Sequence, residues 1–370
     1  MYDLVIRNAR FITGETMDIG VTTGKIQLVV PTIEGLGREE LSLKDGQYLS
    51  AGWIDDHVHC FEKMSLYYDY PDRIGVDMGV TTVIDAGSTG AENISDFYEY
   101  AKKATTNVFA LVNISKKGII KQDELADLSK IQLTLIEQKI KEFSDFIIGL
   151  KARMSQTVVG KNDITPLQLA KKCQKENQEL PLMVHIGSAP PQLVDILAVM
   201  EKGDVLTHCF NGKGNGILDP VTQEIKPFVK KAKAKGVVFD IGHGTDSFNF
   251  HVAEKALQAG IIADSISTDI YIRNRENGPV YDLATTMEKM HIVGYSWIEI
   301  LEKVTNAPAK HFHLKAKGQV KKGFDADFTI FEIHEQKRVL TDSNGNQRES
   351  IQHLKPVSVI IGGVRHECKL

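Results

Sequence analysis

Two histidines separated by one residue, His57 and His59, are the first feature of this chain that could do chemistry. Successive side chains of a β-strand alternate between its faces, so residues at positions i and i+2 point the same way. Two imidazoles on one face can bind a single metal ion. The pair alone is weak evidence, because two histidines that are only exposed or hydrogen-bonded would give the same pattern.

Further residues of metal-binding type stand at the ends of apolar runs later in the chain. They are Lys151, His185, His208 and Asp269. If the runs are strands of a TIM-type barrel, their C-terminal ends surround one cavity, where the catalytic residues of such barrels gather. Such a set, spread over five strands, is much harder to reach by chance than one histidine pair. We therefore predict a metal centre built from the histidine pair and these residues.

Lys151 is the least obvious member, because it follows an apolar run, Ile147 to Leu150, and an ammonium group is costly to bury there. Burial and nearby cations would depress its pKa. A neutral amine can take up carbon dioxide, and the resulting carbamate would bridge two metal ions with anionic oxygens. The alternative is a core lysine paired to Asp269 or another acid. We favour the carbamate, because it explains a lysine where a bridging carboxylate is needed.

Candidates for substrate binding lie beside these positions. Arg153 shares the inward direction of Lys151 if the strand continues, and could anchor a substrate carboxylate. A surface salt bridge is the alternative. His243 stands between two glycines that would let the backbone approach a ligand. It could polarise a carbonyl or bind a carboxylate, or simply cap its loop.

The segment NGKGNGILDP, residues 211–220, is too rich in glycine and asparagine for a helix and could fold over the site as a lid. Asn211 is its candidate substrate contact. Tyr271 and Arg273 follow Asp269 closely and could also reach the substrate, or only support their own loop.

The elements that must position these residues form a repeated pattern of apolar run, polar loop and helical periodicity. Such a pattern is typical of an α/β protein whose parallel sheet is covered by helices, and its span fits a (β/α)8 TIM-type barrel over residues 53–315. An open doubly wound sheet accounts for the number of strands less well, and the first run lacks a dinucleotide-binding glycine fingerprint. The expected strands are 53–59, 81–87, 107–115, 146–155, 180–187, 205–211, 237–244 and 263–270.

Both flanks of the barrel contain short alternating strands and glycine turns. We expect residues 1–52 and 316–370 not to complete a sheet separately and to form one small discontinuous β-sandwich domain together. The Asn344-Gly345 pair predicts a hairpin turn in the second flank.

Composition excludes several other classes of protein. The net charge of -4, with mixed signs, gives no basic stripe for nucleic acid. No apolar run reaches the roughly 18 residues that span a membrane, and the N-terminus does not read as a signal peptide, so we expect a cytoplasmic protein.

Four scattered cysteines indicate neither disulfides nor a cysteine zinc site. Cys60 and Cys209 follow ligand histidines, but adjacent strand residues point to opposite faces.

The segments DDHVHC, IGLKARM, MVHIG, LTHCFNG and STDIY resemble the amidohydrolase superfamily, as do the YDLVIRNARFI opening and the KGFDADFTIFE close. The resemblance implies that His57, His59, Lys151 and Asp269 bind one metal ion and that Lys151, His185 and His208 bind a second. It also implies that a hydroxide bridging the metals attacks the substrate, with Asp269 as base and then acid. Ligands of this kind suit zinc best.

Within that superfamily, the LKAR and GHG segments are most similar to a branch of deacetylases and D-aminoacylase-like or dihydroorotase-like enzymes, some of them named adenine deaminases. We therefore expect hydrolysis of an amide or ester of a small molecule, such as an N-acyl amino acid-like carboxylate. Deamination of adenine is the alternative within enzymes. A non-catalytic scaffold is the alternative outside them, although scaffolds of this kind typically lose the metal ligands. The expected partner is a small-molecule substrate, and a homo-oligomer is compatible with the sequence.

Overall fold

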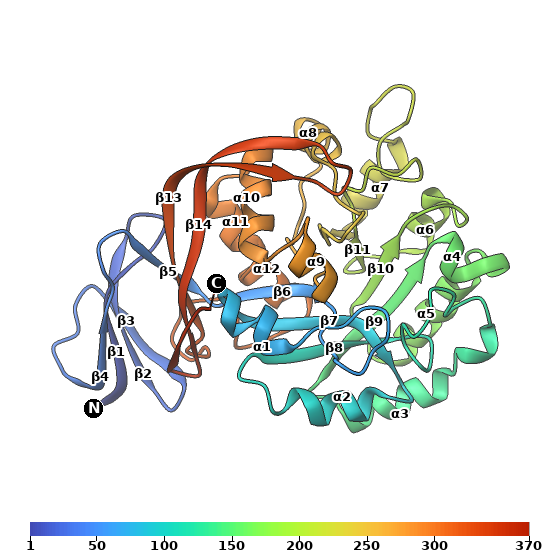
Figure 1. Cartoon of the computed structure of the whole chain (residues 1–370). Coiled ribbons are helices and arrows are strands. Elements are labelled where there is room, and N and C mark those ends of the chain that lie inside the picture. Colours follow the sequence, from blue (N-terminus) through green and yellow to red (C-terminus); the bar gives the residue numbers. More distant parts are fainter. Residues whose placement is uncertain (370) are drawn as a thin grey trace.

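The computed structural model describes residues 1–369, and Leu370 lies outside the described residues. Its central element is a seven-stranded sheet in the order β12-β11-β10-β9-β8-β7-β6, in which each strand pairs in parallel with the next along the chain (Figure 1). The side chains of these strands are almost all buried, as expected for a parallel sheet covered on its faces. The strands are β6 Trp53–Val58, β7 Val80–Gly90, β8 Asn107–Asn113, β9 Ile147–Met154, β10 Leu182–Ile186, β11 Val205–Thr207 and β12 Val238–Phe239.

Helices connect and cover these strands. Their ends carry the expected signals: Asn249 caps α8 through its side chain, and Ser296 with Glu299 forms a capping box at the start of α11. None of the helices in residues 1–369 is long and apolar enough to cross a membrane. The helices are α1 Pro71–Ile74, α2 Ile94–Ala101, α3 Leu133–Glu142, α4 Gln156–Val159, α5 Thr165–Glu176, α6 Leu193–Val199, α7 Pro227–Lys235, α8 Phe250–Gln258, α9 Ile272–Asn277, α10 Leu283–Val293, α11 Trp297–Lys303 and α12 Asn306–His311.

The prediction of eight regular strands is wrong for the last one. Residues 263–270 make only isolated parallel bridges, Asp240 to Ser265 on one side and Val58 to Ile270 on the other. The segment is rich in hydroxyls, and Ser265 and Ser267 donate to the buried Asp240 carboxylate, at 2.9 Å and 2.8 Å. These side-chain bonds compete with a regular ladder. The segment still lies between β12 and β6, so it brings Asp269 beside the first strand.

Two four-stranded sheets stand beside the α/β part (Figure 1). Strands from both ends of the chain share one apolar core, which includes Ile6, Ile19, Phe328 and Ile360. One sheet has the order β3-β2-β1-β4, with β1 Tyr2–Arg10, β2 Thr16–Thr22, β3 Lys25–Val30 and β4 Gly37–Ser42. The other has the order β15-β14-β13-β5, with β5 Gln47–Ala51, β13 Phe328–Thr341, β14 Gln347–Ile361 and β15 Val364–Glu367.

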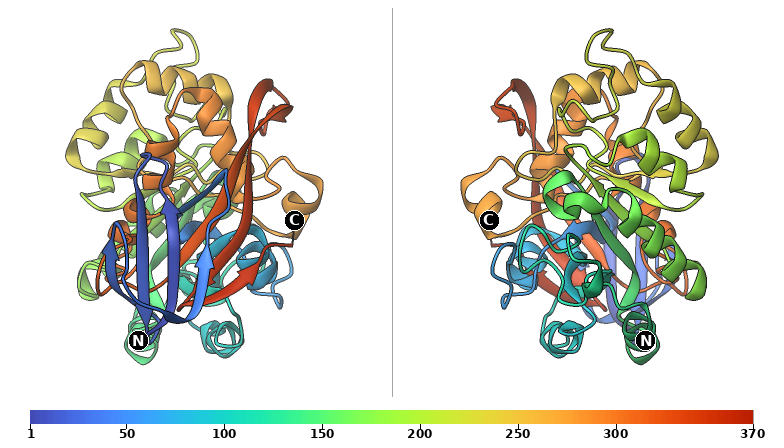
Figure 2. Two further views of the ribbon diagram at one scale, coloured as in Figure 1. Left: turned by 90° about the vertical axis from the view of Figure 1, so that its left-hand side faces the viewer. Right: turned by 90° about the vertical axis from the view of Figure 1, so that its right-hand side faces the viewer.

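Strands β13 and β14 form a long hairpin whose turn includes the Asn344-Gly345 pair. The hairpin extends beyond its sheet and runs across the α/β part towards α8 (Figures 1 and 2). A segment of the second flank therefore reaches the same end of the molecule as the loops that follow β11 and β12.

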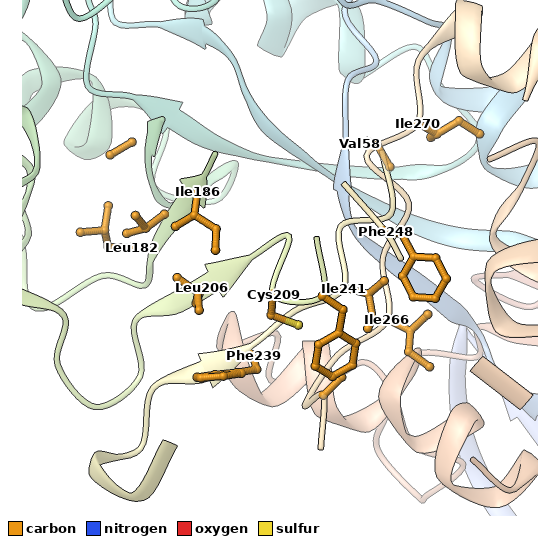
Figure 3. Close-up of a cluster of buried hydrophobic side chains, with 14 of the residues drawn as sticks. Val58, Leu182, Ile186, Leu206, Cys209, Phe239, Ile241, Phe248, Ile266 and Ile270 are labelled. Atoms are coloured by element: carbon orange, nitrogen blue, oxygen red, sulfur yellow. The ribbon is translucent and has the colours of Figure 1, made fainter. Parts of the chain in front are cut away.

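Buried apolar side chains at the strand ends alternate along the chain with polar ones. The apolar side chains pack in the core as one layer, and the polar ones therefore point the other way. Val58 is fully buried in this layer, so His57 and His59 on either side of it point to the opposite face of β6. Figure 3 shows Cys209 in the same layer, near Leu206 and Ile241. Cys60 is also part of this cluster. Both cysteines are therefore packing residues and do not face the site.

Candidate active site

A cavity of about 320 Å³ opens at the C-terminal ends of the strands. Every residue predicted as a metal ligand lines it, although they come from β6, β9, β10, the residue after β11 and the segment before α9. Those residues are His57, His59, Lys151, His185, His208 and Asp269. The predicted constellation is thus brought together around one volume.

His57, His59 and Asp269 form the tightest group, with one ligand atom of each within 4.8 Å of the others. The Asp269 Oδ1 atom lies 3.3 Å from His57 Nε2 and 3.1 Å from His59 Nε2. The Asp269 backbone has φ of 50°, a conformation that non-glycine residues seldom adopt. The surroundings hold this strained conformation, and it turns the carboxylate towards the two imidazoles.

Hydroxyl relays behind the two histidines determine which ring nitrogen carries the proton. The Nδ1 atom of His57 is 2.8 Å from Thr207 Oγ1, and that hydroxyl donates to Asp240 at 2.7 Å. A hydroxyl that donates to a carboxylate accepts from the ring, so Nδ1 of His57 is protonated. His59 has the same arrangement through Ser88 and a buried aspartate, Asp85. In both rings the Nε2 lone pair is therefore free for a metal ion.

His185 and His208 form a second pair with ring centroids 4.8 Å apart, and the His208 ring is also 5.1 Å from that of His57. Nδ1 of His208 bonds to the Gly242 carbonyl at 2.5 Å, which leaves its Nε2 free. Nδ1 of His185 is buried and has no hydrogen-bond partner among residues 1–369. A buried, unpaired nitrogen is costly unless another group satisfies it, and a metal ion would do so.

Burial keeps these rings neutral, as metal ligands must be. Desolvation, with cationic Lys151 next in importance, holds the pKa of His57 well below its usual value. Burial likewise lowers the pKa of His185, and it lowers the pKa of His208 to about 4. Burial raises the pKa of Asp269, but the adjacent His59 and the nearby Lys151 outweigh this effect, so the pKa is lowered from its ordinary value and the carboxylate is ionised.

Lys151 lines the same cavity as the four histidines, with its Nζ atom 3.1 Å from His57 Nε2. Its aliphatic stem passes Gly87, where a Cβ atom would lie only 2.6 Å from Lys151 Cβ. A larger residue at position 87 would therefore displace the lysine. Burial lowers the pKa of Lys151 to about 7, although Asp269 acts in the opposite direction. The amine is thus substantially neutral near pH 7.

Arg153 lines the cavity as predicted, but it is not in a surface salt bridge. Its guanidinium lies 3.3 Å from the buried Glu124 carboxylate and donates to Gln122 at 2.8 Å. It also lies over the ring of Tyr67. Burial raises the pKa of Glu124 to about 7, partly offset by Arg153. These partners hold the arginine in place with one face towards the cavity.

Two predicted substrate contacts do not line the cavity. His243 is fully buried, with Nε2 2.8 Å from Lys289 Nζ and its ring stacked on Phe248. Asn211 is also buried and bonds to the His208 carbonyl at 2.8 Å. It also accepts from the Lys213 amide. Both residues shape the loops beneath the site, because their polar atoms are occupied by protein groups.

Several cavity residues were not singled out from the sequence. Tyr67, Lys213 and Thr245 line the cavity, and Lys213 pairs with Asp246 at 3.0 Å on the facing loop. Tyr271 lines it too, as expected, whereas Arg273 is not among the lining residues. Only the glycine-rich composition around Lys213 hinted at its role, because a flexible loop after a ligand histidine is a common lid.

Known proteins resemble this chain along nearly its whole length. It is 65% identical over 362 residues to a deacetylase of Enterococcus faecalis, covering 98% of both chains. It is 35% identical over 344 residues to deacetylase Atu3266 of Agrobacterium fabrum, covering 92% of this chain and 84% of that one. A family model described as a deacetylase-like composite domain matches residues 320–366.

Solved structures also match the chain along its length. A structure described as an adenine deaminase superposes with a TM-score of 0.98 at 64% identity, covering 99% of this chain and all of that one. A structure described as a dihydroorotase gives a TM-score of 0.91 at 33% identity, with 100% and 99% coverage. A seven-stranded parallel sheet with histidine, lysine and aspartate at its strand ends defines a metal-dependent hydrolase of the amidohydrolase superfamily. The chain belongs to the deacetylase family within it.

Proposed function

We propose that the protein is a binuclear metal-dependent hydrolase that removes an acyl group from a small carboxylate-bearing amide or ester. The observation that carries the proposal is that Lys151 lines the same cavity as four imidazoles, with its Nζ 3.1 Å from His57 Nε2. A bridging anion at this position would complete two adjacent ligand sets.

The donor set fits two divalent ions, with zinc the best match to imidazole and carboxylate ligands. His57, His59 and Asp269 would hold the first, and His185 and His208 the second, with Lys151 shared as a carbamate. The unpaired Nδ1 of His185 supports the second site. Bound ions would polarise the scissile carbonyl and make a water molecule a better nucleophile at neutral pH.

Formation of the carbamate requires the neutral amine of Lys151. Its nitrogen attacks the carbon of carbon dioxide, a nitrogen–carbon bond forms, and one proton leaves to solvent, so that the side chain gains one negative charge. The lowered pKa of Lys151, about 7, makes the amine available under ordinary conditions. Without the carbamate, a cationic lysine would lie beside His57 and oppose metal binding.

Asp269 is the proton-transfer residue in this proposal. Its carboxylate lines the cavity and its side chain is 19% exposed, so it is the ionised acid that a substrate can reach beside the ligand rings. It would take a proton from the attacking water and give it to the leaving nitrogen or oxygen.

The substrate carboxylate is assigned to the cationic side of the cavity. Arg153 and Lys213 both line it, and Tyr67 lies beside the arginine. A substrate anion would gain from both cations in addition to their existing partners Glu124 and Asp246, whereas a neutral purine has no charge to gain from them. The resemblance to a structure described as an adenine deaminase keeps deamination as the second candidate.

A direct assay separates the two candidates. The zinc-loaded protein is incubated with acetylated amino acids, acetylated hydroxy acids and adenine, and release of carboxylic acid or ammonia is measured. We expect hydrolysis of acetylated carboxylates and little ammonia from adenine. Rapid release of ammonia from adenine, without hydrolysis of any acyl compound, would contradict the proposal.

A further inference from the structure

The loop between β12 and α8 packs directly on the proposed proton-transfer residue. A Cβ atom on Gly244 would lie 2.7 Å from Asp269 Oδ2, and the backbone there has φ of +58°. Only glycine permits this contact without strain. The next three residues, 245–247, line the cavity. A shift of this loop would therefore move both the wall of the cavity and the space that Asp269 occupies.

The turn of the β13–β14 hairpin, which lies outside the seven-stranded sheet, bonds to this loop. The Ser343 hydroxyl donates to the Gly244 carbonyl at 3.0 Å and accepts from the Phe248 amide at 3.2 Å. The Ser343 amide donates to the Phe248 carbonyl at 3.0 Å. One serine thus bonds to both ends of the loop, although it lies 99 positions from Gly244.

The hairpin turn is itself fixed. The carboxylate of Asp342 accepts from the Asn344 amide at 2.8 Å and from the Asn346 amide at 2.9 Å. Its other oxygen accepts from the Phe250 amide, the first residue of α8, at 2.9 Å. The turn therefore has a single geometry relative to α8, so Ser343 reaches the loop from a defined position.

Helix α10 joins the hairpin and the loop a second time. Its buried Glu288 accepts from Arg338 on β13 at 2.9 Å and from the Leu354 amide on β14 at 2.8 Å. The next residue, Lys289, bonds to His243 in the loop. The hairpin and the loop thus both bond to α10, so α10 restrains the position of each relative to the other.

From these contacts we infer that Ser343, at the turn of the β13–β14 hairpin, is a positioning residue that holds Gly244 against Asp269 in the geometry that turnover requires. The inference rests on the proposed function of Asp269. In this inference the turn of the hairpin acts on catalysis through the loop that contains Gly244. It does not contact the substrate.

The test compares Ser343→Ala with Ser350→Ala, the same chemical change in the same hairpin. Among residues 1–369 the Ser350 hydroxyl bonds only to Gln352 of its own strand. We expect the kcat of Ser343→Ala to fall on the order of tenfold, because small misplacements at a reacting centre are costly. KM and metal content should stay within about twofold of the unsubstituted enzyme. Ser343→Thr, which keeps the hydroxyl, should restore kcat, and Ser350→Ala should leave it unchanged.

A second readout does not depend on turnover. Hydrogen exchange of the full-length metal-loaded protein should become faster in residues 243–250 of Ser343→Ala and stay unchanged in Ser350→Ala. Unchanged exchange in that loop, or equal kcat in the two alanine variants, would overturn the inference. Failure of the unsubstituted enzyme to hydrolyse any acyl compound would instead contradict the proposed function, and the exchange experiment would still decide whether Ser343 holds the loop.

Discussion

At the scale of single residues, the site holds neutral imidazoles and an ionised carboxylate side by side. Burial alone would make all of these groups neutral. The three imidazoles of His57, His185 and His208 are neutral because they are desolvated, whereas Asp269 stays ionised because His59 and nearby positive groups favour its charge. This division puts three neutral imidazoles and one ionised carboxylate in the same cavity, as the proposed ligand and proton-transfer roles require.

Replacement of Asp269 by asparagine should abolish proton transfer and keep an oxygen ligand. We expect kcat to fall by a factor on the order of 10² to 10⁴, the usual contribution of a general acid–base residue. The measurement is kcat at saturating metal. Asp163→Asn, at an exposed position outside the cavity lining, is the control and should keep full activity. A modest loss in Asp269→Asn, below about threefold, would show that another group moves the proton.

The relay behind His57 gives a second prediction at this scale. Thr207→Val keeps the shape of the side chain and removes the hydroxyl between His57 and Asp240. The ring then loses the partner that fixes its tautomer, so we expect metal affinity to fall about 10- to 100-fold.

Competition with a chelator would measure that change. Thr82→Val is a matched control, because the Thr82 hydroxyl is buried and has no hydrogen-bond partner within residues 1–369. It should bind metal normally. Equal affinity in the two valine variants would mean that the relay does not support the ligand.

At the scale of elements, the ligands stand where strands end and regular structure stops. Strands β11 and β12 are short, and the polar residues after them belong to irregular segments. Helices cover these strands, and their contribution to the free energy of unfolding can be measured separately from any effect on the site.

Helix α11 offers such a separation. The Ser296 hydroxyl accepts from the Glu299 amide, and the Glu299 carboxylate accepts from the Ser296 amide at 2.8 Å. Ser296→Ala should lower the free energy of unfolding by about 1 kcal/mol, a typical value for loss of an N-cap. Urea denaturation measures this. Metal content and kcat should not change, and loss of bound metal would show that α11 supports the site directly.

The sequence predicted which His, Lys and Asp side chains line one cavity, because their positions at strand ends are local features that a parallel sheet collects in one place. It did not predict features that depend on distant contacts. The His243 ring is occupied by Lys289 from α10, and nothing near His243 in the sequence indicates this. The regularity of residues 263–270 was also overestimated, because the hydroxyls that bond to buried Asp240 look like ordinary strand residues in the sequence.

At the scale of the whole molecule, burial of Lys151 couples metal loading to pH. Its pKa is lowered to about 7, so the neutral amine that reacts with carbon dioxide is the minor form below that pH and the major form above it. Metal-free protein given zinc and bicarbonate should therefore regain activity faster as pH rises through about 7. Reactivation rates between about pH 6 and pH 8, at constant dissolved carbon dioxide, test this. A rate that does not change with pH would contradict the role of the amine.

The central claim is that Lys151 holds two metal ions through a carbamate, and one measurement tests it most directly. The protein is loaded with zinc in ¹³C-labelled bicarbonate, bound metal is counted, and ¹³C NMR is recorded. The Lys171→Ala variant is the control, since Lys171 is a buried lysine paired with Asp204 away from the cavity. We predict two zinc ions per chain and a carbamate signal in the unsubstituted and Lys171→Ala proteins, and loss of the signal and of bound zinc in Lys151→Ala. One zinc ion or fewer in the unsubstituted protein, with no carbamate signal, would contradict the account.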